Sequence, residues 1–139
     1  MTSKTIISLD VGNKRIGVAV ASLGARLPSP YGVIQNDHQA LKSICDLAIT
    51  QGAAAIIIGL PRNLNGQDTD QTKIVRDFAD KLSNVCQLPL HFQDEALTSK
   101  KAEKELQDRG VRYTKEAIDA LAATYILTDF LQEHPEVKI

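Results

Sequence analysis

The run TIISLDVGNKRIGVAVA, residues 5–21, decides the fold of this chain. It holds two apolar segments rich in β-branched residues, 5–11 and 15–21, separated by a Gly-Asn pair that is typical of tight turns between antiparallel strands. A third apolar segment, 31–35, follows two prolines that limit strand pairing to a sheet edge. The sequence therefore predicts that the chain opens with a three-stranded antiparallel meander.

After this meander the hydrophobic period changes. The spacing of the apolar residues now predicts a helix over about 38–51, with Asp37 as the N-cap and Gly52 just past the end. The apolar run at 53–58 is typical of a strand that is covered on both faces. We then expect a helix from Asp68 or Thr69 to about 83 and a strand at 88–93. A charged helix follows, capped by Thr98 and closed by Gly110. The final helix spans about 115–132, is capped by Thr114 and is followed by a frayed tail. This order predicts an α/β fold with a mixed five-stranded sheet, three antiparallel strands and then two parallel ones, flanked by helices.

The composition narrows the class of protein. The 139 residues are 43% hydrophobic and 24% charged, which indicates a globular chain forming a single domain, 1–139. No apolar run approaches the ~18 residues that a membrane span requires, and the first residues lack the apolar region of a signal peptide, so we expect a cytoplasmic protein. The net charge of −1 provides no overall attraction to nucleic acid, so any such binding requires a local basic patch. Two cysteines without CxxC spacing and three scattered histidines predict free buried thiols and no zinc site.

Four acidic residues occupy unusual positions. Asp10 lies inside an apolar strand, where an ionised carboxylate is costly unless it is paired or bound to a metal. Asp94 and Glu95 follow the predicted strand 88–93 at its C-terminal end, the edge at which open α/β sheets bind ligands. Asp119 lies among small residues in the final helix. Each has an ordinary alternative: a turn cap for Asp10, helix-start acids for the pair, and an exposed surface carboxylate for Asp119.

Taken together, these acids predict a metal centre at one edge of the sheet. If the last helix packs across that edge, three or four carboxylates converge, repel one another and raise their own pKa values. Mg²⁺ or Mn²⁺ relieves such repulsion and also binds water and phosphate oxygens. Two such ions ~3.5–4 Å apart can activate a water and stabilise the leaving oxygen in phosphodiester hydrolysis.

Five runs of the chain carry a family resemblance: LDVGNKRIGVAVAS, YGVIQ, IIIGLPRNLNGQ, DEALTS and IDALAATYIL. In this order, within 5–131, they resemble the signature blocks of the YqgF/RuvX family, bacterial candidate Holliday junction resolvases that are also described as pre-16S rRNA nucleases. The resemblance implies an RNase H-like fold. It places the first family acid at Asp10, the acidic pair at Asp94 and Glu95, and the helical acid at Asp119. Within the pair we favour Glu95 as the metal ligand.

Three features depart from the pattern of such proteins. The acidic block of the family usually reads Asp-Glu-Arg-Leu-Thr, whereas this chain has Ala96 in place of the arginine. Arg62 stands where a hydrophobic residue is more usual, so it could replace that arginine at a scissile phosphate. In related resolvases an acid follows the strand that corresponds to 53–58, but here GLPRN contains no carboxylate. The acid cluster must therefore draw on the next strand.

Polar and cationic side chains near the acids are candidate nucleic-acid contacts. The candidates are Lys14, Arg15, Arg62, Asn63, Lys100 and Lys101. The first four lie in or beside predicted loops close to the acids, where contacts to phosphate position a substrate without reading its bases. The two remaining lysines belong to the charged helix, whose alternative role is a solvated face. Three Phe, three Tyr and no Trp give little support for an aromatic platform that stacks single strands.

These observations predict an endonuclease that hydrolyses phosphodiester bonds in structured nucleic acid with two divalent cations, Mg²⁺ or Mn²⁺. The resemblance implies processing of the pre-16S rRNA 5′ end first and resolution of branched DNA second, and the latter would call for a two-fold homodimer. A catalytically weak ribosome-maturation factor that binds a precursor particle stays open, because Ala96 and the near-zero net charge favour it. An actin-like ATPase is disfavoured because such enzymes need two copies of the domain.

Overall fold

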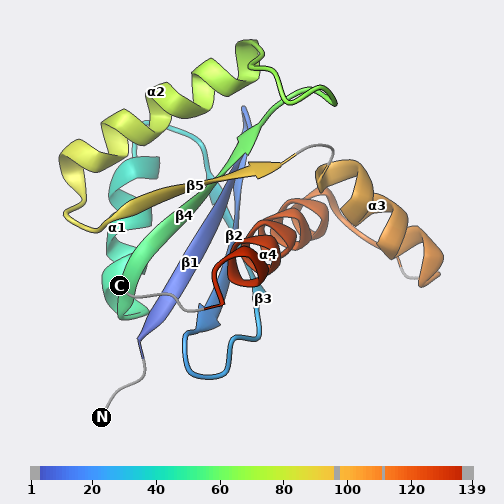
Figure 1. The fold of residues 1–139 in the computed structure, drawn as a ribbon, viewed down its shortest axis with the longest axis horizontal. Coiled ribbons are helices and arrows are strands. Elements are labelled where there is room, and N and C mark those ends of the chain that lie inside the picture. Colours follow the sequence, from blue (N-terminus) through green and yellow to red (C-terminus); the bar gives the residue numbers. More distant parts are fainter. Residues whose placement is uncertain (1–3, 96–97, 111, 136–139) are drawn as a thin grey trace.

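The computed structural model describes residues 4–95, 98–110 and 112–135, which form a five-stranded sheet with helices on both faces (Figure 1). In chain order the elements are β1 (Thr5–Val11), β2 (Arg15–Ser22), β3 (Ser29–Gln35), α1 (Ala40–Thr50), β4 (Ala53–Pro61), α2 (Asp70–Val85), β5 (Leu90–Glu95), α3 (Thr98–Asp108) and α4 (Lys115–Glu133). The strand order is β3-β2-β1-β4-β5, with the β1–β2 and β2–β3 pairs antiparallel and the β1–β4 and β4–β5 pairs parallel. The predicted mixed sheet is confirmed.

Side chains alternate between two hydrophobic layers, one on each face of the sheet. Leu9 of β1 and Ile58 of β4 point into the layer that α1 and α2 cover. Ile6 of β1 and Ile57 of β4 point to the opposite face of the sheet, where they pack with Ile126 of α4 in the other layer. Because successive strand residues face opposite sides, even-numbered positions of β1 face α4. That parity places the side chain of Asp10 on the α4 face.

Helix α4 approaches the sheet closely at two glycines. A Cβ at Gly17 of β2 would overlap the backbone carbonyl oxygen of Asp119, and one at Gly59 of β4 would overlap the Ile126 side chain. Glycine lets backbone come this close because it has no Cβ. The two positions therefore fix the height of α4 above the sheet and the places where its side chains meet the strands.

Helix α1 begins two residues later than predicted, and Asp37 is not its N-cap. The N-cap is Gln39, whose side chain makes no capping bond. Asp37 instead accepts a hydrogen bond from the Gln39 backbone N–H through Oδ1 at 2.9 Å, which closes a turn before the helix. The predicted glycine after α1 is confirmed, since Gly52 has a φ of 65°. Thr69, one of the two expected starts, caps α2, and Thr114 caps α4 as predicted.

Strand β5 is shifted by two residues from the predicted range 88–93. Pro89 has no backbone N–H and cannot open the paired strand, although its carbonyl accepts a bond from the backbone of β4 at 3.0 Å. The strand therefore spans Leu90–Glu95, and Asp94 and Glu95 pair in register with the last two residues of β4. The acidic pair lies inside the strand rather than after it. Its two side chains consequently point to opposite faces of the sheet.

The remaining boundaries differ little from prediction. β3 begins at Ser29, β4 extends to Pro61, and Gly110 closes α3 with a φ of 66°. The capping role predicted for the Thr98 side chain, the tail after Pro135 and the consequence of Ala96 lie outside the described residues. In the described part of the chain, no helix has the length and apolar character that crossing a membrane requires.

Candidate active site

Asp10 and Asp119 lie next to each other where β1 ends. Asp10 pairs with Gly17 of β2, and the α4 backbone at Asp119 lies against that same glycine. Burial, followed by the negative charge of Asp119, raises the pKa of Asp10 from its ordinary 3.8 to about 6. The sequence analysis expected these two acids to meet, and the structure brings them together.

Arg15 at the start of β2 neutralises one of the two carboxylates. Its Nε donates to Oδ2 of Asp119 at 2.7 Å, and about a fifth of each side chain is exposed (23% and 20%). This hydrogen bond raises the pKa of the Arg15 guanidinium, which stays charged. Arg15 orients Asp119 in this structure, and its predicted contact to phosphate stays a prediction. Its neighbour Lys14 is exposed in the turn between β1 and β2.

Glu95 meets an acid that the sequence analysis did not select. Burial, then a hydrogen bond with Asp129 of α4 and the charge of that group, raises the pKa of Glu95 to about 9. Lys101 acts in the opposite direction, and Glu133 adds to the increase. Nearby, Nε2 of Gln93 donates to Oε2 of Glu133 at 2.9 Å. Glu95 therefore keeps its proton at neutral pH.

Asp10 and Glu95 thus belong to two separate carboxylate pairs rather than to one cluster. Asp119 and Asp129 are ten residues apart on α4, which corresponds to about 15 Å along the helix axis. Asp10 joins the first of these acids and Glu95 the second, with β4 lying between β1 and β5. Within residues 4–95, 98–110 and 112–135, no group of three or more His, Cys, Asp or Glu side chains is arranged to hold a metal ion. The expected convergence of three or four carboxylates is not observed.

Asp94 points away from this face and contacts Arg62. Their side chains lie 3.4 Å apart, from Nε to Oδ1, and two thirds of the Asp94 side chain is exposed. Arg62 also lies 3.5 Å from Asp68 and donates through Nη1 to the Gly66 carbonyl oxygen at 3.3 Å. The β4–α2 loop is therefore closed on the guanidinium of Arg62 at the end of β4.

Asn63 organises the same loop from within. Its Oδ1 accepts bonds from the backbone N–H groups of Asn65 and Gln67 at 3.0 and 2.9 Å, and its Nδ2 donates to the Gln67 side chain at 3.1 Å. Of the two lysines predicted on the charged helix, the side chain of Lys100 lies outside the described residues. The Nζ atom of Lys101 lies 4.6 Å from the centroid of the Tyr125 ring.

The chemistry of Asp10 and Asp119 fits a hard divalent cation. Magnesium is typically held by one or two carboxylates together with waters and phosphate oxygens, which matches a pair of this kind. Burial, and then the charge of Asp119, disfavour the ionised form of Asp10, and a bound cation would favour that form. At the same sheet edge, Oε1 of Glu95 is buried and has no hydrogen-bond partner among the described residues. The donors are all oxygens, as Mg²⁺ and Mn²⁺ prefer.

The two cysteines lie on the other side of the sheet and do not act as nucleophiles. A hydrogen bond with Cys86, followed by burial, raises the pKa of the Cys45 thiol to about 11. Cys45 also donates to the Val85 carbonyl oxygen at 3.6 Å. Because the thiolate is the reactive form, this thiol is unreactive at neutral pH. The predicted free thiols are confirmed, with Cys86 buried and Cys45 half-buried.

Sequence reasoning missed Asp129, although a signal for it was present. Asp129 follows Tyr125 by four residues and Ile126 by three, so it falls on the apolar stripe of α4. An acid on an apolar stripe is the same anomaly that identified Asp10. Tyr125, one turn before Asp129, is half-buried beside Lys101.

Solved structures with this fold define the class. RuvC of Thermus thermophilus, in complex with a Holliday junction substrate, matches with a TM-score of 0.55 at 16% identity, over 93% of this chain and 95% of that one. The fowlpox virus resolvase, in complex with substrate Holliday junction DNA, matches with a TM-score of 0.51 at 13% identity, over 96% and 99% of the two chains. The fold is therefore the RNase H-like fold of the resolvases, as predicted.

Sequence comparison then identifies the family. The family model RuvX, described as Holliday junction resolvase, matches residues 4–133, and the chain belongs to this family. A candidate pre-16S rRNA nuclease of Chloroflexus aggregans is 37% identical over 94% of this chain and 95% of its own length. Another, from Lactococcus lactis subsp. cremoris, is 36% identical over 93% and 94%. The resemblance seen in the five sequence runs is confirmed.

Proposed function

We propose that this chain is an endonuclease that hydrolyses phosphodiester bonds in structured nucleic acid with Mg²⁺ or Mn²⁺, and that its role is to process the pre-16S rRNA 5′ end. The observation that carries the proposal is the partly buried carboxylate pair Asp10 and Asp119 at the edge of the sheet. Membership of the RuvX family supports a nuclease, and the candidate pre-16S rRNA nucleases among its relatives support the substrate.

In the proposed reaction, Asp10 and Asp119 would hold a divalent cation through their carboxylate oxygens, and Arg15 keeps Asp119 in place. Such ions, when bound, lower the pKa of a water and offset the charge that develops on the phosphate. Glu95, with Asp129 beside it, would hold a separate ion, because Asp129 lies about 15 Å from Asp119 along α4, too far for two ions to share one phosphate. Lys14 contacts the substrate through phosphates and reads no base sequence.

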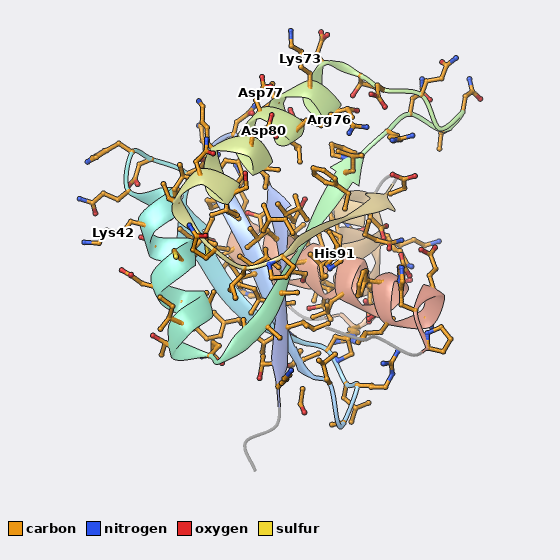
Figure 2. The ribbon with its side chains drawn as sticks, turned by 60° about the vertical axis from the view of Figure 1, so that its left-hand side comes forward. Lys42, Lys73, Arg76, Asp77, Asp80 and His91 are labelled. Carbon is orange, nitrogen blue, oxygen red and sulfur yellow. The ribbon has the colours of Figure 1, made fainter. Side chains whose placement is uncertain are left out.

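The first test is the isosteric removal of one charge. Asp10→Asn is expected to lower Mg²⁺- or Mn²⁺-dependent cleavage of a precursor rRNA fragment by more than about 100-fold, because even groups that only support metal ligands contribute 10- to 100-fold. Asp80→Asn is the matched control, since Asp80 is exposed on α2 (Figure 2). Cleavage at the wild-type rate by purified Asp10→Asn would contradict the mechanism.

Branched DNA is the second candidate substrate, favoured by the description of the family model and by the junction-bound resolvases that share the fold. A four-way DNA junction and a precursor rRNA fragment, assayed side by side with each metal, distinguish the two. Symmetric junction cleavage also requires a two-fold dimer, which sedimentation detects. Binding of the RNA without any cleavage by the wild-type protein would instead indicate a maturation factor that assists a ribosomal precursor particle.

A further inference from the structure

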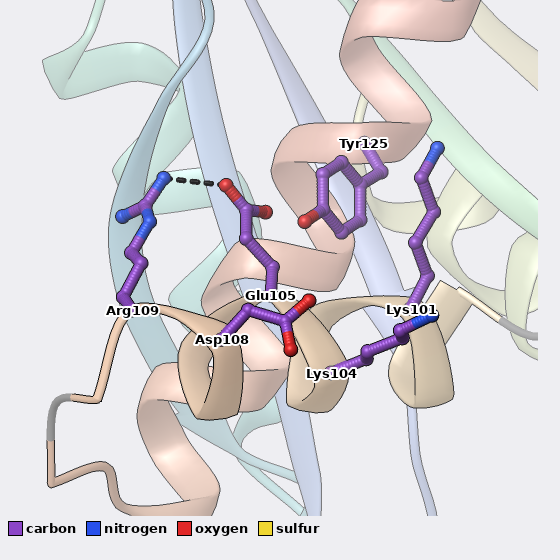
Figure 3. Close-up of a pocket in the computed structure, with 6 residues that line it drawn as sticks. All are labelled: Lys101, Lys104, Glu105, Asp108, Arg109 and Tyr125. Atoms are coloured by element: carbon purple, nitrogen blue, oxygen red, sulfur yellow. Dashed lines mark hydrogen bonds and ion pairs between the residues drawn. The ribbon is translucent and has the colours of Figure 1, made fainter.

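A hollow between α3 and α4 lies beside the proposed active site. It has a volume of about 470 Å³, and the residues that line it are Lys101, Lys104, Glu105, Asp108, Arg109 and Tyr125 (Figure 3). This volume is within the range of sites that bind small ligands, which is roughly 300–1,000 Å³. Its wall combines one aromatic ring from α4 with two lysines and two acids from α3, and with Arg109 just after the end of α3.

The hollow borders the Glu95–Asp129 pair. Tyr125 precedes Asp129 by four residues, so the two side chains lie on the same side of α4 one turn apart. Lys101 connects the two places: its Nζ lies 4.6 Å from the centre of the Tyr125 ring, and its charge also acts on Glu95. The hollow therefore lies next to the Glu95–Asp129 pair.

The lining has the chemistry of a site for an unpaired nucleotide. Proteins bind single strands by stacking bases on aromatic rings and holding the backbone with cations. Tyr125 provides a ring, and Lys101 and Lys104 provide two ammonium groups on the α3 side. Glu105 adds an acceptor: one of its oxygens bonds to Arg109, while Oε2 is buried without a hydrogen-bond partner among the described residues. A nucleotide amino or hydroxyl group would satisfy that oxygen.

We propose that this hollow binds one unpaired nucleotide of the substrate next to the cleaved bond, with its base stacked on Tyr125 and its phosphate held by Lys101 and Lys104. On binding, the Lys101 ammonium moves from the ring to the phosphate, and the base takes its place on the ring. The proposal rests on the nuclease function above and specifies its substrate as nucleic acid with a single-stranded nucleotide beside the scissile phosphate. The low aromatic content had argued against stacking, but one ring between lysines is enough for one base.

The test measures binding separately from cleavage, in the Asp10→Asn background. A short fluorescein-labelled RNA strand is titrated by anisotropy, and abasic nucleotides replace each position in turn. Tyr125→Leu is expected to weaken binding about tenfold, the loss of one stacked base, whereas Tyr125→Phe keeps the affinity. In the parent protein, an abasic nucleotide at one position should cause the same loss of affinity. In Tyr125→Leu that abasic nucleotide should cause no further loss, because the two changes remove the same stacking contact.

The cations are tested through salt dependence. Lys104→Gln should lower the slope of log K against log salt by about 0.7, the value for one phosphate contact to a single strand. Lys42→Gln and Lys73→Gln, on α1 and α2 (Figure 2), make the same charge change elsewhere and should leave the slope unchanged. A DNA strand of the same base sequence is titrated in parallel. Equal binding of DNA and RNA indicates recognition of base and phosphate, and a preference for RNA indicates that Glu105 accepts a hydrogen bond from the 2′-hydroxyl. Either result supports the site if a fully paired duplex shows no effect of Tyr125→Leu.

Two results would overturn the site. One is a folded Tyr125→Leu protein, verified by circular dichroism, that binds the strand as tightly as its parent. The other is an abasic penalty that persists in full in that variant. If Tyr125→Leu does not fold, the abasic series in the parent decides, and a series in which no position matters rejects the proposal. Cleavage by the wild-type protein with no effect of Tyr125→Leu on binding would reject the nucleotide site and keep the nuclease function. An effect of Tyr125→Leu on binding without cleavage by the wild-type protein would reject the nuclease function and keep the nucleotide site.

Discussion

Asp10 has a carboxyl group whose ionised form is disfavoured in the folded protein. Its strand neighbours Leu9 and Val11 are buried in the core, and its own carboxyl faces α4 beside Asp119. Both burial and the neighbouring charge disfavour the ionised form, so the folded protein binds a proton there more tightly than the unfolded chain does. The residue therefore destabilises the fold at neutral pH in the absence of a cation.

Asp10→Asn should for this reason stabilise the metal-free protein at neutral pH. The pKa shift from 3.8 to about 6 corresponds to at most about 3 kcal/mol. The contribution of the protonated form is complete below the unfolded pKa and is lost as the pH rises through about 6, so wild type and variant should converge near about pH 4. Urea unfolding with EDTA at the two pH values measures this, with Asp80→Asn as the control. A variant less stable than wild type at neutral pH would show that the carboxylate is not strained.

Among the elements, α4 does the most to build the site. It provides Asp119 to one carboxylate pair and Asp129 to the other, and it is held by the buried Ser8 hydroxyl, which donates to the Ala123 carbonyl oxygen at 2.6 Å. At the far end, Arg26 binds the carbonyl oxygen of Leu131 at 2.6 Å. The helix is therefore fixed at several points along its length rather than only by its apolar stripe.

Gly17→Ala tests whether that position of α4 matters. The new Cβ would overlap backbone, which cannot rotate away, so the helix must move; we expect a loss of about 2–3 kcal/mol in unfolding free energy, within the range of overpacked cores. Gly24→Ala is the control, because its Cβ would lie an ordinary 3.6 Å from Ser22 Oγ, and it should change stability by less than about 0.5 kcal/mol. Because the helix carries Asp119, cleavage should fall with stability in the first variant alone. Equal stability of the two variants in urea would contradict the close packing.

The sequence predicted what depends on local chemistry. Strand alternation and the cap at Thr114 were predicted in this way. The Asp10–Asp119 pairing was predicted from the expected packing of the last helix across the sheet edge. The partner of Glu95 was not, because it depends on the angle at which α4 crosses the sheet, and that angle is a property of packing. The start of β5 was predicted two residues too early because the prediction followed the apolar run. Pro89 lies within that run and has no backbone N–H, which sets the start of the strand.

At the scale of the whole molecule, the cations are distributed so that a net charge of −1 does not prevent binding of nucleic acid. Lys14 and Arg62 lie in loops at the C-terminal edge of the parallel strands, and Lys101 and Lys104 lie on α3 beside that edge. The exposed acids Asp77 and Asp80 are on α2 (Figure 2). Attraction to phosphate is therefore local.

Binding should accordingly depend on salt only moderately. With four phosphate contacts to a single strand, the slope of log K against log salt is about −3, which corresponds to roughly a 50-fold loss of affinity between 50 and 200 mM salt. Anisotropy titrations of the labelled RNA strand across this range measure the slope. A slope near −10 would mean that the contact surface extends far beyond the edge described, and a slope near zero would mean that phosphate is not recognised.

The placement of Asp119 and Asp129 on the last helix also bears on how the protein is made. During synthesis Asp10 and Glu95 leave the ribosome well before their partners, because α4 occupies Lys115–Glu133. A nascent or prematurely terminated chain therefore carries half of each acidic pair. Such a fragment is expected to lack the proposed cation site, because each carboxylate pair is incomplete without α4.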